Sequence, residues 1–159
     1  MTATHTPLHI WTGVFFCLLN QGAHGAEQSF TVQGRSMLPA IKPGQQVTIS
    51  DQCLIAGENL LHQVTAIKIA TRPHPLLKRI AGTPGQRVRF SSNEIIIGER
   101  KWSIPGVASS LLQRQLKHTD FIIPDNSFLA LSDQPVDSLD SVDFGLIARP
   151  QIKGCLQTD

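Results

Sequence analysis

The amino-acid sequence predicts a mainly β fold with antiparallel sheet and one short helix. Two observations predict this class. Glycine and proline interrupt the chain about every ten residues, which is typical of short strands joined by turns. Apolar residues also alternate with polar ones in several short runs, the period of two that a half-buried strand produces. With 159 residues, 41% of them hydrophobic, the chain has the size of a single domain with one core.

The charge pattern excludes two classes of partner. The 14 lysines and arginines are scattered, so the chain lacks the basic stripe of a nucleic-acid-binding protein. An acidic loop near the C-terminus does not have the spacing of a calcium-binding loop. We therefore expect no nucleic acid, no metal site and no cofactor. The aspartates of that loop are Asp133, Asp137, Asp140 and Asp143.

Residues 1–26 have the composition of a targeting segment. The run from Leu8 to Leu19 is apolar but has only about half of the roughly 20 residues that a membrane-spanning helix needs. Small residues within Ala23 to Ala26 offer a cleavage site of the kind that follows a secretory signal. We expect a cleavable signal peptide or a short membrane anchor, although a buried helix has the same length. The first two alternatives export a domain formed by residues 27–159.

The cysteines leave two interpretations open. Cys17 lies inside the apolar run without the small residue before it that lipid attachment needs, so lipidation is not expected. Cys53 and Cys155 are then the pair in the exported part, and an oxidising compartment permits a disulfide between them. Two buried free thiols account for the sequence equally well.

Strand and turn signals follow one another along residues 27–159. Pro43-Gly44 and Pro84-Gly85 have the residues of type II turns. The polar segment from Asp133 to Gly145 is expected as a loop, and Ser109–His118 is the best candidate for the helix. The expected strands cover residues 30–34, 64–70, 76–81, 88–90, 94–97 and 127–132, together with the residues around Val47 and Ile49 and around Leu146 and Ile147.

Lys78 lies within the strand expected over residues 76–81. Alternation places Leu76, Lys78 and Ile80 on one face, so the amine shares that face with aliphatic side chains. Burial there disfavours the charged form and lowers the pKa from about 10.4 toward the range in which a neutral amine accepts a proton. On the strand pattern alone, a lysine at a sheet edge whose amine reaches water is the better interpretation. Ser36 taken alone is likewise explained by a polar turn.

Three segments in this order change that balance. The nucleophile box of type I signal peptidases resembles GRSMLPAIKPGQQV, their lysine box resembles LLKRIAGTPGQRV, and their C-terminal box resembles LALSDQPVDSLDSVDFG. The likeness extends from Phe30 to Gly154, nearly all of the expected domain. The chain therefore resembles the type I signal peptidase family, and this implies the antiparallel signal-peptidase-like fold for residues 27–159.

The resemblance implies a Ser-Lys dyad that needs no histidine. Ser36 is implied as the nucleophile, whose backbone N–H also holds the oxyanion, and Lys78 as the general base. Ser138 is implied as the serine that hydrogen-bonds the lysine amine, and Asp140 as the acid that braces the loop. Gly34 stands where some members supply a hydroxyl, so a second oxyanion donor is not expected.

The residues after the nucleophile are expected at the substrate groove. Met37 and Leu38 follow Ser36 directly, and small residues such as alanine are implied at the first and third positions before the cut. Exposed apolar side chains there are also expected to contact the membrane surface.

Four positions depart from the family pattern without changing the dyad. The acid that follows each Pro-Gly turn in the family is replaced by glutamine. A glycine of the C-terminal box is replaced by serine. An arginine that commonly pairs with the loop aspartate is replaced by valine. Arg79 is then the candidate partner of Asp140. The departures favour a specialised substrate over general housekeeping activity. They are Gln45, Gln86, Ser132 and Val142.

The expected function is that of a serine endopeptidase that removes signal or leader peptides from exported precursors. The short chain resembles the TraF-type peptidases of conjugative transfer, which implies a propilin as substrate. We expect it at the periplasmic face of the inner membrane, or in the soluble periplasm if residues 1–26 are removed.

Alternative functions are weaker. An exported peptide-binding protein with little or no catalysis fits the four departures, but it has no chemical reason to retain both Ser36 and Lys78. A LexA-like self-cleaving regulator is disfavoured by the export signal and by the lack of a DNA-binding region. A histidine-based serine protease lacks a recognisable motif around His62, His74 or His118.

Overall fold

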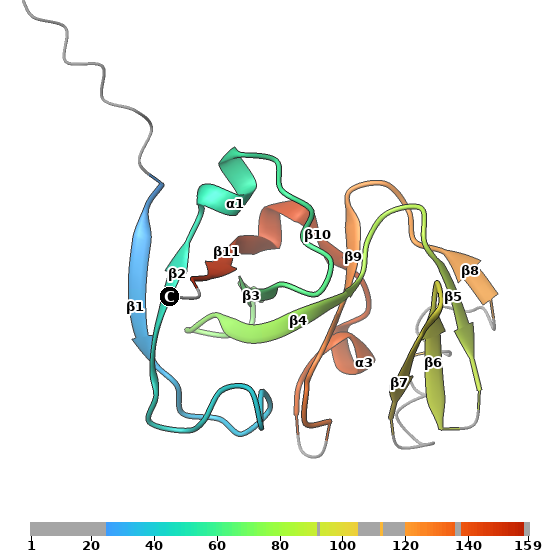
Figure 1. Ribbon diagram of the computed structural model, residues 1–159, viewed down its shortest axis with the longest axis horizontal. Coiled ribbons are helices and arrows are strands. Elements are labelled where there is room, and N and C mark those ends of the chain that lie inside the picture. The colour runs from blue at the N-terminus through green and yellow to red at the C-terminus, as the bar shows by residue number, and fades with distance from the viewer. Residues whose placement is uncertain (1–24, 92, 105–111, 113–119, 136–137, 158–159) are drawn as a thin grey trace, which may run out of the picture.

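The computed structural model describes residues 25–91, 93–104, 112, 120–135 and 138–157. Two sheets lie side by side in it (Figure 1). The seven-stranded sheet has the order β1-β2-β11-β3-β4-β9-β10, and the four-stranded sheet has the order β7-β6-β5-β8. All strand pairs among the described residues are antiparallel, which confirms the predicted mainly β class.

The elements are short, and turns connect most of them. The larger sheet contains β1 (Glu27–Thr31), β2 (Gln46–Ser50), β3 (Val64–Ile67), β4 (Leu76–Gly82), β9 (Ser127–Leu131), β10 (Ile147–Ala148) and β11 (Ile152–Leu156). The smaller sheet contains β5 (Arg87–Phe90), β6 (Glu94–Ile97), β7 (Arg100–Ser103) and β8 (Asp120–Ile122). The described helical turns are α1 (Gln52–Ile55), α3 (Ser141–Phe144) and η1 (Arg149–Gln151).

The smaller sheet is inserted between two neighbouring strands of the larger one. β4 runs into β5, and the chain returns from β8 to β9, which pairs with β4 (Figure 1). Because of this arrangement, the lysine segment on β4 and the polar segment after β9 lie next to each other, although they are far apart in the sequence.

The structure differs from the expected elements at several places. β7, β8 and β11 were not expected as strands, and α1 and α3 were not expected as helices. α3 lies inside the segment from Asp133 to Gly145 that was expected as a loop, and the Asp140 side chain caps its N-terminus. The helix expected over Ser109–His118 lies outside the described residues except for Leu112, which is buried.

The two Pro-Gly turns form as expected. Gly44 and Gly85 both have a φ of +82°, the left-handed value that the third position of a type II turn requires. In each turn the following glutamine replaces an acid of the family pattern and accepts a backbone hydrogen bond. Gln45 accepts from the Lys42 N–H at 3.1 Å, and Gln86 accepts from the Thr83 N–H at 2.8 Å. These two departures therefore retain an acceptor that closes the turn.

Apolar side chains gather in three clusters. One lies against the segment that carries Ser36, one surrounds the disulfide, and the third joins the smaller sheet to β9. Among the described residues, the buried members of the first cluster are Met37, Ile41, Val47 and Val64.

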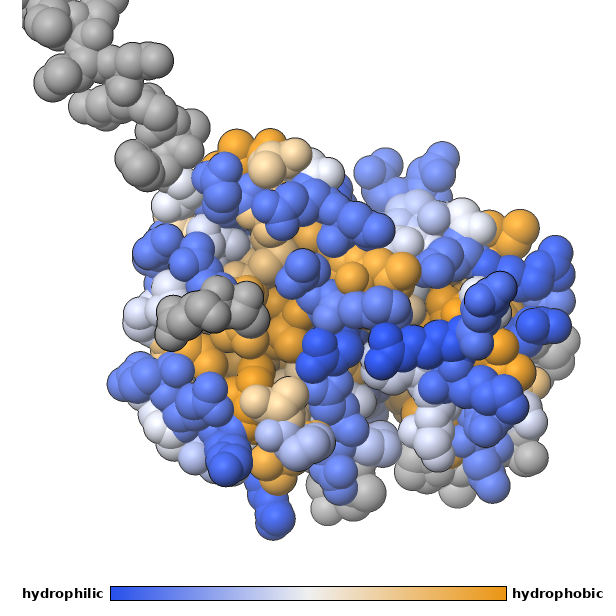
Figure 2. Space-filling model, viewed as in Figure 1, coloured by the Kyte–Doolittle hydropathy of each residue, from blue (hydrophilic) through white to orange (hydrophobic). Residues whose placement is uncertain are grey.

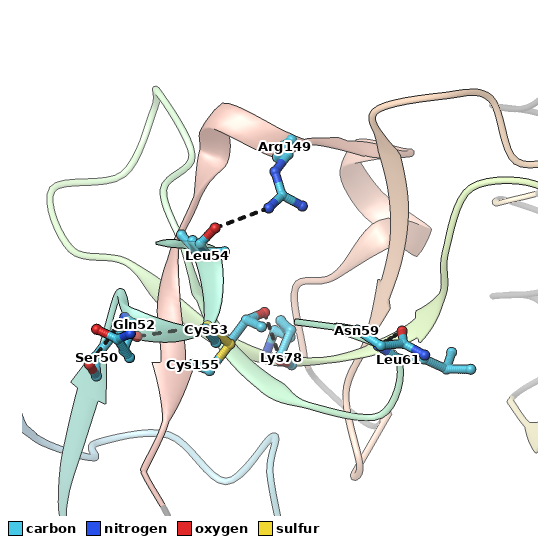
Figure 3. Close-up of a disulfide and its surroundings, with 10 residues drawn as sticks. Ser50, Gln52, Cys53, Leu54, Asn59, Leu61, Lys78, Arg149 and Cys155 are labelled. Atoms are coloured by element: carbon cyan, nitrogen blue, oxygen red, sulfur yellow. Dashed lines mark hydrogen bonds between the residues drawn. A yellow bond between two sulfur atoms is a disulfide. The ribbon is translucent and has the colours of Figure 1, made fainter. Parts of the chain in front are cut away.

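A disulfide joins α1 to the last strand. Cys53 and Cys155 are bonded, with Cα atoms 6.2 Å apart and a separation of 102 residues in sequence (Figure 3). Nearby, the Arg149 guanidinium donates to the Leu54 carbonyl at 3.5 Å (Figure 3). The disulfide interpretation of the two cysteines is therefore correct, and the free-thiol interpretation is wrong.

No helix among the described residues is long and apolar enough to cross a membrane. The signal peptide or anchor expected in residues 1–26 falls almost wholly outside the described residues, which begin at Gly25.

Candidate active site

Ser36 lies in a turn that follows β1 and covers residues 35–41. The Leu38 N–H donates to the Arg35 carbonyl at 3.1 Å across this turn. Ser36 is half-buried, and the next side chain, Met37, is buried in the core. An apolar anchor directly after the serine therefore fixes the turn against the sheet.

Lys78 lies in the middle of β4, opposite Thr65 of β3. The residue is only 3% exposed. Its amine donates a hydrogen bond to the Ser36 hydroxyl, with Nζ and Oγ 2.7 Å apart. The structure thus brings together the two residues that the sequence singled out, from segments separated by 42 positions.

Burial lowers the pKa of the Lys78 amine from 10.5 to about 8, because the charged form loses its hydration. The carboxylates of Asp140, Asp143 and Asp133 oppose this and raise the pKa, but their influence is smaller. The salt bridges of the described residues do not include Lys78. Ser36 and Lys78 are therefore arranged for proton transfer from a hydroxyl to an amine that is partly neutral near pH 7.

Arg79, the next residue on β4, has a different partner from the one expected. Its Nε and Nη2 donate to the two carboxylate oxygens of Asp133 at 2.7 and 2.6 Å. The expected pairing with Asp140 is wrong. Asp133 follows β9, in which Leu131 lies opposite Arg79, so the two charged side chains meet at the end of the same strand pair.

Asp140 joins the end of β9 to the start of α3. Its Oδ2 accepts from the Ser132 N–H at 2.9 Å, and its Oδ1 accepts from the Val142 N–H at 3.0 Å. Its own N–H donates to Asp143 Oδ2 at 2.9 Å, which completes a capping box. The carboxylate is 3% exposed and braces the loop, as the family resemblance implies for this position.

Ser138 has a different partner from the one that the resemblance implies. Its hydroxyl donates to Ser132 Oγ at 2.7 Å and lies 3.5 Å from Asp140 Oδ2. Within the described residues, the amine of Lys78 is bonded to Ser36 and not to Ser138. Ser132 stands where the family pattern has glycine, and its added hydroxyl accepts the hydrogen bond of Ser138. The departure at Ser132 thus accounts for the changed partner of Ser138.

The backbone of Ser36 is oriented by its carbonyl group. That carbonyl accepts from the Gln134 N–H at 2.8 Å, whereas the Ser36 N–H has no acceptor within the described residues. A free N–H beside an attacking serine is what an oxyanion requires. A Cβ added at Gly34 would meet nothing within 4 Å beyond its chain neighbours, so the space at the position where some family members supply a hydroxyl is open.

The expectation of exposed apolar side chains directly after Ser36 is wrong for Met37. Met37 is only 1% exposed, because the turn uses it as a core anchor. Leu38 is half-buried. Two surface hollows of the described part of the chain are lined by other residues, Phe30 among them, and neither includes Ser36.

Two residues of this site were not singled out from the sequence. Asp133 belongs to the C-terminal box, and its position directly after a predicted strand was the available signal for the partner of Arg79. Gln134 contributes a backbone N–H, and such a donor cannot be recognised from a pattern of side chains.

Comparisons with known proteins agree with these motifs. Residues 14–158 match the family described as signal peptidase, peptidase S26. The chain is 26% identical over 140 residues to signal peptidase IB of Staphylococcus aureus strain COL, covering 79% of this chain and 73% of that protein. It is 24% identical over 139 residues to signal peptidase I of Bacillus amyloliquefaciens, covering 82% of this chain and 72% of that protein. Among solved structures, a signal peptidase I from Enterococcus faecalis V583 matches with 18% identity and a TM-score of 0.45, over 63% of this chain and 97% of that one.

Proposed function

This chain belongs to the type I signal peptidase family of serine endopeptidases, which act on exported precursor proteins, and we propose that it cleaves signal or leader peptides with Ser36 as nucleophile and Lys78 as general base. The observation that carries the proposal is the 2.7 Å contact between the Lys78 amine and the Ser36 hydroxyl. The lowered pKa of that amine supports the same assignment.

Acylation follows from this contact. The neutral Lys78 amine takes the proton of the Ser36 hydroxyl while Oγ attacks the scissile carbonyl. The carbonyl oxygen becomes an oxyanion that the Ser36 N–H stabilises. When the C–N bond breaks, Lys78 returns its proton to the leaving amine, which becomes the N-terminus of the mature protein. The leader peptide stays attached to Ser36 as an ester.

Deacylation repeats the exchange with water. Lys78, neutral again, removes a proton from the attacking water, and the second tetrahedral intermediate uses the same N–H of Ser36. The ester C–O bond breaks, Lys78 returns its proton to Oγ, and the leader leaves with a free carboxylate. Both steps need Lys78 without its proton at the start.

The precursor is proposed to bind as an added strand. Within the described residues, β1 and β4 each have a free backbone edge. β1 pairs with β2 on one side and with no described strand on the other. β4 pairs with β3 along Leu76 and Leu77, but its pairing with β9 begins only at Arg79, so Leu76 and Leu77 have no described partner strand on that side. Such edges accept an extended peptide through main-chain hydrogen bonds. The apolar surface over the larger sheet in Figure 2 suits the small apolar residues that the family resemblance implies before the cut.

A specialised substrate is the finer part of the proposal. The departures at Ser132 and Val142, and the changed partner of Ser138, motivate maturation of a conjugative propilin by a TraF-type peptidase. We place the enzyme at the periplasmic face of the inner membrane or in the soluble periplasm. The Cys53–Cys155 disulfide supports an oxidising compartment.

The test offers the full-length protein two precursors, a generic secretory precursor and a propilin from its own genetic neighbourhood. Selective cleavage of the propilin supports the specialised role, and equal cleavage rejects it. Absence of cleavage of both, together with saturable binding, would instead favour the peptide-binding protein. Ser36→Ala and Lys78→Ala serve as controls, because retained cleavage by either folded variant contradicts the dyad.

A further inference from the structure

Ser36 is held at two points, by strand β4 of the larger sheet and by the segment that follows the neighbouring strand β9. Its hydroxyl accepts a hydrogen bond from Lys78 of β4, and its carbonyl accepts one from the Gln134 N–H at 2.8 Å. Gln134 lies in the segment that follows β9, the neighbour of β4. The side chain of the nucleophile and its main chain are therefore fixed independently.

The segment that contains Gln134 is itself anchored at the two preceding residues. The Asp133 carboxylate is held by Arg79 through two hydrogen bonds, and the side chains of this pair are only 12% and 22% exposed. The Ser132 N–H donates to the buried carboxylate of Asp140. The two residues directly before Gln134 are therefore both held by hydrogen bonds.

A closed ring results from these contacts. It runs from Lys78 to Ser36 through the amine, from Ser36 to Gln134 through the carbonyl, and from Asp133 back to Arg79, the neighbour of Lys78. General base and nucleophile are thus both attached to β4 and to the segment that follows β9. Any shift of the segment after β9 would move Ser36 relative to the amine.

We propose that Gln134 is a positioning residue that acts through its backbone N–H, and that the Arg79–Asp133 pair holds this N–H in place. The contact keeps the Ser36 hydroxyl at the lysine amine and leaves the Ser36 N–H free for the oxyanion. Displacement of a reacting group by about 1 Å can cost on the order of a hundredfold in rate, so the contact has a direct effect on turnover. The inference rests on the proposed Ser-Lys mechanism.

The first test removes the N–H without changing charge. Gln134→Pro has no donor, whereas Gln134→Ala keeps it. The full-length protein is assayed on a peptide that spans a secretory cleavage site, with alanine at the first and third positions before the cut. We expect the kcat of Gln134→Pro to fall at least about tenfold below that of Gln134→Ala, with KM changed less than about threefold. The pH midpoint should be the same in both variants.

A second substitution covers the case in which the proline variant does not fold. Replacement of Gln134 by its α-hydroxy acid converts the amide into a backbone ester, which removes the N–H and keeps the side chain. The same loss of kcat is expected. Equal kcat for the folded ester and the wild type would overturn the proposal, and so would equal kcat for folded Gln134→Pro and Gln134→Ala.

The contribution of the ion pair is tested by a double-mutant cycle. Asp133→Asn releases the anchor, so the ester at 134 should lower kcat much less in that background than in the wild type. Fully additive effects would show that the Arg79–Asp133 pair acts independently of the N–H. Failure of the proposed function is recognised separately, because the wild type would then leave the peptide uncleaved, or Ser36→Ala would cleave it as fast as the wild type, whatever residue stands at 134.

Discussion

The Asp140 carboxylate accepts a hydrogen bond from the Ser132 N–H at 2.9 Å, and this contact ties the start of α3 to the end of β9. Asp140 is buried and also caps the helix at Val142. Asp140→Ala leaves two backbone donors without their acceptor, so we expect a loss of about 2 kcal/mol in the free energy of unfolding. Asp140→Asn keeps a capping oxygen and should lose clearly less. Denaturant unfolding of the two variants checks the order, and equal losses would contradict the capping role.

The fold was predictable where strands are regular. The residues 94–97 and 127–132 are short apolar runs bounded by polar residues, and the structure has strands there at Glu94–Ile97 and Ser127–Leu131. β11 was missed because Lys153 and Gly154 interrupt its pattern. Gly154 packs so closely on β2 that an added Cβ would lie 2.5 Å from the Ser50 carbonyl oxygen. Only the neighbouring strand, and no local pattern, determines such an irregular segment.

The sequence predicted only those parts of the site that side chains of recognisable motifs form. Family motifs indicated Ser36 and Lys78, and the structure places them in contact. The partner of Ser138 was predicted wrongly, because the effect of a hydroxyl at Ser132 depends on the distance between two loop residues. The N–H of Gln134 could not be predicted, since its role depends on where the chain passes and not on its side chain.

The disulfide should make a large contribution to stability. It closes a loop of 102 residues between Cys53 and Cys155. In the chain-entropy model, a loop of this length corresponds to a stabilisation of about 4 to 5 kcal/mol, as an upper estimate. Thermal unfolding with and without a thiol reductant measures the effect. The Cys53→Ser/Cys155→Ser double variant should melt at the temperature of the reduced wild type and should not respond to reductant. A reductant-induced shift in that variant would assign the effect to another cause.

A second oxyanion donor should be tolerated at Gly34. A Cβ there meets nothing within 4 Å beyond its chain neighbours, and the family resemblance implies a hydroxyl at this position in some members. Because one oxyanion donor is worth about 10²–10³ in kcat in other serine proteases, Gly34→Ser should raise kcat by about tenfold or more if its hydroxyl reaches the oxyanion. Gly34→Ala is the matched control without the hydroxyl. Equal kcat for the serine and alanine variants would show that the position contributes no donor.

Cleavage should depend on deprotonation of Lys78. Its pKa is lowered to about 8, so the single-turnover rate is expected to rise with pH through about 8 and to level off above it. Lys78→Arg should be inactive, because a guanidinium keeps its proton in proteins. Asp133→Asn removes a carboxylate that raises this pKa, so its midpoint should lie at lower pH. The pH profiles of the wild type and Asp133→Asn test both statements. Substantial cleavage by folded Lys78→Ala would rule out the dyad.

The same lowered pKa means that Lys78 destabilises the folded protein at neutral pH. The amine binds a proton less strongly in the folded state, where its pKa is about 8, than in the unfolded state, where it is 10.5. Below about pH 8 the full penalty applies, on the order of 3 kcal/mol at most for a difference of this size. Between about 8 and 10.5 the unfolded chain holds more protons than the folded one, so this contribution to stability improves as pH rises.

Lys78→Met, which keeps the length of the side chain without the charge, should therefore be inactive but more stable than the wild type at pH 7. The difference in the free energy of unfolding should shrink as pH increases toward 10. Denaturant unfolding of both proteins at pH 7 and pH 9.5 measures it. A Lys78→Met variant that is less stable at pH 7 would show that the contact with Ser36 outweighs the burial of the ammonium group.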